Sequence, residues 1–194
     1  MTEKLPKRPI GTAAAQSERE LLERIRSRDS QAFRLFYERY AGYLTAVCSR
    51  YLPERADASD VLQESFIKMF GALDGFQYRG DGSLKAWASR IVVNTALKSL
   101  RRKGRLRYVE ELPELPEEEA PDVARVPPEV VQGFIKALPD GYRTVFNLFV
   151  FEKKSHREIA GLLGIKEDSS ASQYARARAV LARQIKQYLK EHDE

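Results

Sequence analysis

The segment from Phe76 to Arg107 combines cations with flat aromatic rings. It holds nine lysine or arginine residues and a single acid, Asp81. Phe76, Tyr78 and Trp87 are interleaved with these charges, and the run 79–83, RGDGS, predicts a loop because glycine favours turns over helix. Phosphates of single-stranded DNA need cations and its bases stack on aromatic rings, so the segment is typical of a single-strand binding site.

A helix-turn-helix pattern follows near the C-terminal end. Ser155 and Glu158 have the spacing of a capping box, Gly164 permits a sharp turn, and a second helix is expected to start near Asp168. Between Ala171 and Lys190 there are five basic residues and no acidic one. We predict that this helix enters the major groove of DNA. Its outward-facing residues are predicted to include Ser172, Gln173, Arg176 and Arg183.

A third pattern, around Asp60, is typical of protein docking. Asp60, Gln63 and Glu64 are spaced by three and four residues, so on a helix they share one face. Phe66 lies next to them in the sequence and adds an apolar side chain. A polar, acidic face with an adjacent aromatic residue suits contact with another protein.

Each of the three patterns also has a plainer interpretation. Phe76 and Trp87 offer large apolar areas and fit a hydrophobic core equally well. The C-terminal helices could form a simple helical hairpin with a solvated basic face. The face around Asp60 could likewise be no more than a solvated surface.

Helices are predicted to position all three patterns. Apolar residues recur at spacings of three and four through 17–107 and again through 128–189, and no alternating strand pattern persists. Asp29 is predicted to cap one helix. Asp57 and Asp60 are spaced as the cap and partner of another, and a further helix is expected over 84–102. The fold class is therefore all-α.

The charge pattern divides the chain into two small helical domains. Residues 110–122 hold seven acidic side chains, no basic ones and three prolines, which predicts an extended, flexible linker. The expected division is a disordered tail over 1–16, a first domain over 17–107, an acidic linker over 108–127 and a second domain over 128–194.

Composition and single residues argue against several other classes. The net charge is +5 and 43% of the residues are hydrophobic, which fits a soluble domain with a core. Cys48 has no disulfide partner, and no stretch approaches a membrane span, so a cytoplasmic protein is expected. His156 and His192 lie far apart, and no phosphate loop or metal spacing is visible. We therefore predict no catalytic residue, metal or cofactor.

The ordered set of motifs resembles the extracytoplasmic-function (ECF) sigma factors, group IV of the bacterial primary-sigma superfamily. Residues 60–66, DVLQESF, resemble the D-x-x-Q-E-x-F signature of sigma domain two. Residues 76–96 resemble the promoter-opening segment of that domain. Residues 138–160 and the R-A-R at 176–178 resemble sigma domain four. Together these motifs cover most of residues 17–190, and no domain three is present.

The resemblance implies a DNA-reading subunit of RNA polymerase that recognises the −35 and −10 elements and opens the DNA. Its partners would be promoter DNA and core polymerase, the latter through the clamp coiled coil of the largest subunit and the flap of the second-largest. An anti-sigma factor is a further candidate partner, and membrane insertion is not expected. The residues implied for polymerase binding are Asp60, Gln63, Glu64 and Phe66. Those implied for the −10 element are Gln77, Arg79, Asp81, Ser83, Trp87, Arg90, Ile91, Asn94 and Lys98. Those implied for the −35 element are Ser155, Ser169, Ser172, Gln173, Ala175, Arg176 and Arg178.

Two departures from the family pattern concern DNA recognition. Asp168 and Ser169 stand where the family usually has Gly-Thr, and Ala171 stands where it usually has a basic residue. One extra residue also precedes Arg79 in the loop. A rival hypothesis is a repressor or activator with one helix-turn-helix, which leaves the Asp60 face unexplained. A protein-only adaptor leaves the two basic segments unexplained.

Overall fold

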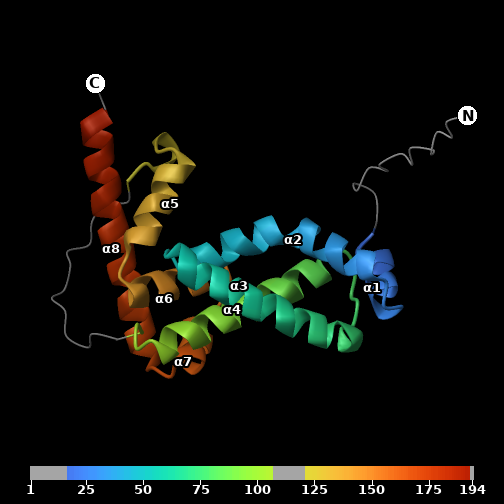
Figure 1. The fold of residues 1–194 in the computed structure, drawn as a ribbon. Helices are drawn as coiled ribbons and strands as arrows, with labels where there is room; N and C mark the ends of the chain where they lie inside the picture. The colour runs from blue at the N-terminus through green and yellow to red at the C-terminus, as the bar shows by residue number, and fades with distance from the viewer. Residues whose placement is uncertain (1–16, 107–120, 193–194) are drawn as a thin grey trace, which may run out of the picture.

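The computed structural model describes residues 17–106 and 121–192. Throughout these ranges every regular element is helical, which confirms the all-α prediction (Figure 1). The α-helices are α1 (Glu18–Arg26), α2 (Ser30–Tyr51), α3 (Arg55–Ala72), α4 (Ser83–Arg102), α5 (Pro128–Ala137), α6 (Asp140–Val150), α7 (His156–Leu163) and α8 (Glu167–His192). Two short 3-10 helices are η1 (Leu73–Gly75) and η2 (Val123–Arg125).

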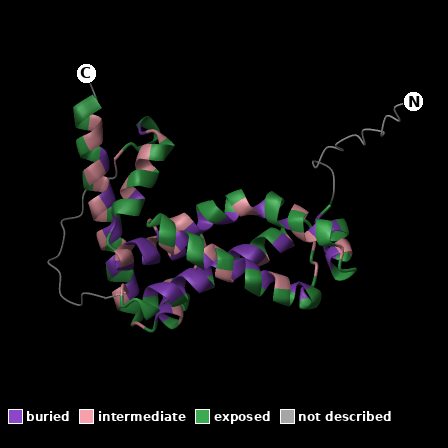
Figure 2. Cartoon of the chain, viewed as in Figure 1, coloured by how far each residue is buried: buried purple, intermediate pink, exposed green. Residues whose placement is uncertain are grey.

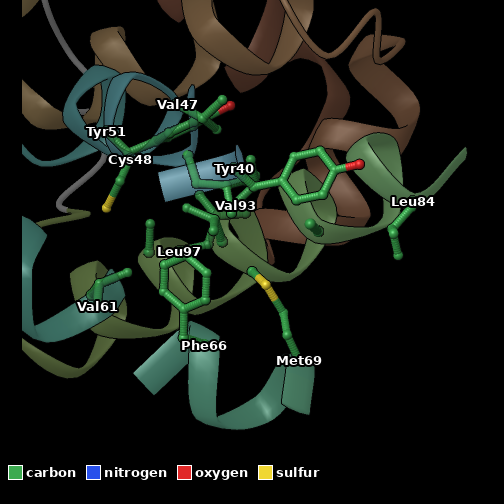
Figure 3. Packing of buried hydrophobic residues seen from close by; sticks show 14 of the residues in the cluster. Tyr40, Val47, Cys48, Tyr51, Val61, Phe66, Met69, Leu84, Val93 and Leu97 are labelled. Carbon is green, nitrogen blue, oxygen red and sulfur yellow. The ribbon is translucent and has the colours of Figure 1, made fainter. Parts of the chain in front are cut away.

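Helices α2, α3 and α4 pack side by side, and α1 lies across one end of them (Figure 1). Their shared core is lined by aliphatic and aromatic side chains (Figure 3). Phe36, Leu44 and Leu97 are almost fully buried within it. Asp29 caps α2 by accepting a hydrogen bond from the Gln31 N–H, as predicted. Burial of Cys48 within this core raises the pKa of its thiol to about 12.

The predicted cap of α3 is wrong. The helix begins at Arg55, after Glu54, so Asp57 lies inside its first turn. The Asp57 carboxylate instead accepts hydrogen bonds from Lys103 Nζ at 2.5 Å and Arg105 Nη1 at 2.9 Å, beyond the end of α4. These contacts between segments far apart in the sequence outweigh the local capping pattern, and they lower the pKa of Asp57.

Helices α5 to α8 form the second helical unit, at the left of Figure 1. Ile135 and Leu138 pack against Ala177 and Leu181 of α8. These four residues form a small, separate hydrophobic core. The burial pattern of α8 is one-sided, as expected of a helix packed along one face (Figure 2). The predicted tail 1–16, Arg107 and residues 108–120 of the predicted linker lie outside the described residues.

The last residues of the predicted linker, 121–127, include a short helix. Residues 123–125 form η2, capped by Asp122, whose side chain accepts a hydrogen bond from the Ala124 N–H at 3.2 Å. The next residue, Val126, is buried. Burial of this apolar side chain offsets the entropy of ordering the segment.

The two helical units also pack against each other. Val145, Leu148 and Ile159 belong to the same buried cluster as the residues of α2 and α4. Asn147 Nδ2 donates a hydrogen bond to the Arg50 carbonyl at 2.8 Å, and Arg143 Nη2 donates one to the Tyr51 carbonyl at 3.2 Å. Carbonyls at a helix C-terminus lack intrahelical partners, so α6 satisfies the end of α2.

Candidate nucleic-acid interface

The loop before α4 is a compact turn with exposed polar tips. Gly80 and Gly82 have φ values of 111° and 86°, in the left-handed region that favours glycine. The Tyr78 hydroxyl donates a hydrogen bond to Asp81 Oδ1 at 2.7 Å, and the Arg79 N–H donates one to Ser83 Oγ at 3.2 Å. Gln77, Arg79 and Asp81 are exposed, and Ser83 is half-buried at the start of α4. The turn is therefore a preformed surface rather than a disordered connection.

One face of α4 continues this surface. Arg90, Asn94 and Lys98 are exposed and spaced four apart, so they form a stripe along the helix. Ile91 is half-buried beside them. Trp87 is also half-buried and packs on Phe76, with ring centroids 5.1 Å apart. The nine residues predicted for the −10 element thus lie on this turn and on α4 between Ser83 and Lys98.

The acidic face of α3 is present, with one correction. Asp60 and Gln63 are exposed and Glu64 is partly exposed. Phe66, by contrast, is only 7% exposed and packs against Phe36, with ring centroids 6.3 Å apart. Its placement on a docking surface was wrong, because the helical phase turns it into the core.

Sequence reasoning missed Ile67 on this face. It is 73% exposed and lies three and seven residues after Glu64 and Asp60. The three-and-four spacing that grouped the polar residues also includes Ile67. Glu64 Oε1 pairs with Lys68 Nζ at 2.8 Å. That hydrogen bond lowers the pKa of Glu64.

The helix-turn-helix forms as predicted. Ser155 Oγ accepts a hydrogen bond from the Glu158 N–H at 3.2 Å, and Glu158 Oε2 accepts one from the Ser155 N–H at 2.9 Å, which completes the capping box. Gly164 ends α7 with a φ of 70°. His156 stacks on Phe149, with ring centroids 4.7 Å apart. The hydrogen bond from Lys154 Nζ at 2.7 Å, together with the capping contacts, lowers the pKa of Glu158 to about 2.

The outer face of α8 differs from the prediction at Gln173. Ser172, Ala175 and Arg178 are exposed. Ser169 and Arg176 are half-buried, and Ser155 is exposed next to its capping partner. Gln173 is only 3% exposed, because it lies one turn before Ala177 on the buried side of the helix. Gln173 is therefore removed from the predicted DNA-facing set.

Comparison with known proteins decides between the hypotheses. The family model for sigma-70 region 2 matches residues 36–106, and that for sigma-70, region 4 matches residues 129–181. The ECF RNA polymerase sigma-E factor of Salmonella typhimurium is 32% identical over 179 residues, which cover 85% of this chain and 92% of that protein. The chain belongs to the ECF sigma factors.

Two further relatives, both sigma factors, agree with this assignment. The RNA polymerase sigma-H factor of Pseudomonas aeruginosa is 30% identical over 190 residues, covering 91% of this chain and 97% of that protein. The sigma-E factor of Escherichia coli K12 is 31% identical over 179 residues, covering 85% and 92% respectively. A solved structure described as "Structure of CnrH in complex with the cytosolic domain of CnrY" is 25% identical, with a TM-score of 0.47, and covers 92% of this chain and 100% of that one.

Membership of this family gives the function of the sigma factor. It associates with RNA polymerase and directs promoter-specific transcription initiation. The rival repressor with one helix-turn-helix does not account for the region 2 match, which contains the α3 face and the α4 stripe. Across the described ranges, no helix is long and apolar enough to cross a bilayer. The same ranges contain no group of three potential metal-binding side chains.

Proposed function

We propose that this sigma factor captures the −10 element with the turn before α4 and the exposed stripe of α4. The observation that carries the proposal is the alignment of Arg90, Asn94 and Lys98 on one exposed face that continues from the preformed turn. Cations on this face would neutralise phosphates. The Asn94 amide, with one donor and one acceptor side, would hold a base flipped out of the duplex.

Replacing Asn94 with alanine is expected to slow promoter opening. Unstacking a base costs a few kcal/mol, and hydrogen bonds to the flipped base offset part of that cost. We expect formation of a permanganate-reactive bubble to slow by about 10- to 100-fold, equivalent to about 1–3 kcal/mol. Gel-shift titration of duplex promoter by the holoenzyme should change little.

The matched control is Gln132→Ala, which removes an exposed amide from α5. It should leave both bubble formation and duplex binding near wild type. Equal loss of both activities in the Asn94→Ala protein would contradict a role confined to opening.

We propose that the α3 face docks on the clamp coiled coil of the polymerase largest subunit. Asp60 and Glu64 would pair with cations there, while exposed Ile67 would supply an apolar contact. The second helical unit would contact the flap of the second-largest subunit while α8 reads the −35 element. Sigma domain two would then span 17–107 and sigma domain four 128–194.

The exposed Ala171 leads to a separate expectation for binding of the −35 element. Ala171 is exposed but presents only a methyl group, so it contributes no contact with a phosphate. Ala171→Arg is expected to tighten duplex binding and to steepen the salt dependence, log K against log [salt], by about one unit. Arg176→Ala is expected to cost about 1–3 kcal/mol if its guanidinium reads a base.

Titrations on −35 variants over a salt series measure both effects. Ala124→Arg adds the same charge at an exposed site outside α8 and should leave the slope unchanged. If neither Ala171→Arg nor Arg176→Ala alters −35 binding, α8 is not the recognition helix.

We propose that the protein works in the cytoplasm, where promoter DNA and RNA polymerase are found, and that it acts by binding rather than by catalysis. The acidic linker would thread toward the RNA exit path, since its charge resembles that of nascent RNA. An anti-sigma factor remains a candidate regulator.

A further inference from the structure

Glu18, the first residue of α1, is a buried carboxylate that none of the sigma motifs includes. It is only 5% exposed. Its Oε2 accepts hydrogen bonds from the Gly82 N–H at 2.8 Å and the Leu84 N–H at 3.2 Å. Its Oε1 accepts one from the Tyr40 hydroxyl at 2.8 Å and a longer one from the Lys85 N–H at 3.4 Å. Because four donors bind it, this buried carboxylate is held in one position in the fold.

These contacts supply the cap that α4 lacks. The residue before α4 is Gly82, which has no side chain to accept a hydrogen bond, and the first turn of α4 contains no acid. The first N–H groups of a helix have no intrahelical partners, and the positive end of the helix dipole favours an anion there. Glu18 provides both the acceptors and the charge from a helix more than 60 residues earlier.

The other end of the same loop is also attached to this part of the chain. Arg26, the last residue of α1, donates from Nη2 to the Phe76 carbonyl at 2.6 Å. Arg28 pairs with Asp74 at 2.8 Å, although both side chains are exposed and this pair adds little stability. Residues 77–81 therefore lie between two anchored points. The Phe76 carbonyl is bound by Arg26, and the Gly82 N–H is bound by Glu18.

We propose that α1 is the positioning element of the −10 loop and that Glu18 is its principal positioning residue. Glu18 is buried beneath the loop and does not contact DNA itself. It fixes the backbone at Gly82 and Leu84, which sets the directions in which Arg79 and Asp81 present their side chains. This inference rests on the proposed function of the loop in reading the −10 element.

The test is Glu18→Gln in the full chain, with two separate measurements. The glutamine keeps the shape of the side chain but removes the charge and turns an NH₂ group toward backbone donors. Amide hydrogen exchange at Gly82, Leu84 and Lys85 should accelerate by about tenfold or more. In holoenzyme, the ratio of opening rates between the preferred −10 sequence and single-base variants should fall by about tenfold, while −35 duplex binding stays within about twofold.

Two controls separate positioning from general stability. Glu23→Gln makes the same chemical change at an exposed site on α1 and should alter neither measurement. Leu52→Ala removes a side chain that is 0% exposed just after the C-terminal end of α2, so it lowers stability without changing α1 or the carboxylate. It should leave the selectivity ratio near wild type.

The outcomes are distinguishable. Unchanged exchange at the three amides in Glu18→Gln would overturn the positioning role. An equal fall in selectivity in Leu52→Ala would also overturn it, because the effect would then be one of stability. Faster exchange with unchanged selectivity would show instead that the loop does not read the −10 element, which would overturn its proposed function.

Discussion

Replacing Arg143 with alanine is expected to lower the free energy of unfolding by about 3–5 kcal/mol. Arg143 is only 3% exposed. Its Nη1 donates to the Leu138 carbonyl at 2.6 Å and the Lys136 carbonyl at 3.1 Å, and its Nη2 donates to the Tyr51 carbonyl and pairs with Asp140. Burial lowers the pKa of the guanidinium, which reflects the cost of removing its charge from water.

The large effect follows from what the alanine would leave behind. Carbonyls at the end of α2 and beyond the end of α5 would lose their donors inside the protein, and Asp140 would keep only Arg105. Each unsatisfied buried carbonyl costs about 1–3 kcal/mol. Urea unfolding followed by far-UV circular dichroism would measure the change.

Two further variants serve as controls in the urea unfolding experiment. Arg143→Lys keeps the charge but cannot reproduce the planar fork of donors, so most of the loss should remain. Arg19→Ala removes an exposed arginine with one ion-pair partner and should cost less than about 1 kcal/mol. A change below about 1 kcal/mol in Arg143→Ala would mean that these hydrogen bonds contribute little to the packing of α6 on α2.

Replacing Glu64 with lysine is expected to weaken binding to core polymerase by about 2–5 kcal/mol. Glu64 lies in the centre of the exposed α3 face, and its side chain is 42% exposed, so a partner's cation can reach it. A lysine there would leave that cation unpaired and would place two positive charges side by side. Pull-down of core polymerase and a fluorescence titration would measure the loss.

Charge within the sigma factor itself must be separated from docking. The positive charges of Lys68, Lys98 and Arg102 all lower the pKa of Glu64. A lysine at position 64 would therefore be repelled by the same charges within the sigma factor. Glu64→Gln removes the attraction without adding repulsion and should show an intermediate loss. Glu23→Lys reverses an exposed charge on α1 and should bind as wild type does. If Glu64→Lys also binds as wild type does, the α3 face is not the docking surface.

Features that depend on neighbouring residues could be predicted from the sequence. The Asp29 cap, the Ser155 capping box and the turn at Gly164 form as expected. So does the glycine-containing loop before α4. Each of these depends on contacts or spacings within about one to three turns of helix, and that information is present in the local sequence.

The predictions failed where the direction of a side chain around its helix axis had to be known to within one residue. Gln173 was placed outward and Phe66 on the docking face, yet both side chains are buried. Successive residues on a helix differ by about 100° in direction, so adjacent positions can face opposite environments. Only the packing of α8 on α6 and of α3 on α2 decided which side faces inward.

Contacts between distant segments were decided by the tertiary structure alone. Asp57 bonds to Lys103 and Arg105 rather than capping α3. Glu18 caps α4 across 64 or more residues, and α6 satisfies the end of α2 through Arg143 and Asn147. Orphan N–H and C=O groups at helix ends accept any partner with suitable geometry. The sequence therefore determined which helices form and which faces are polar. The tertiary structure decided which distant side chains bind the N–H and C=O groups left over at the helix ends.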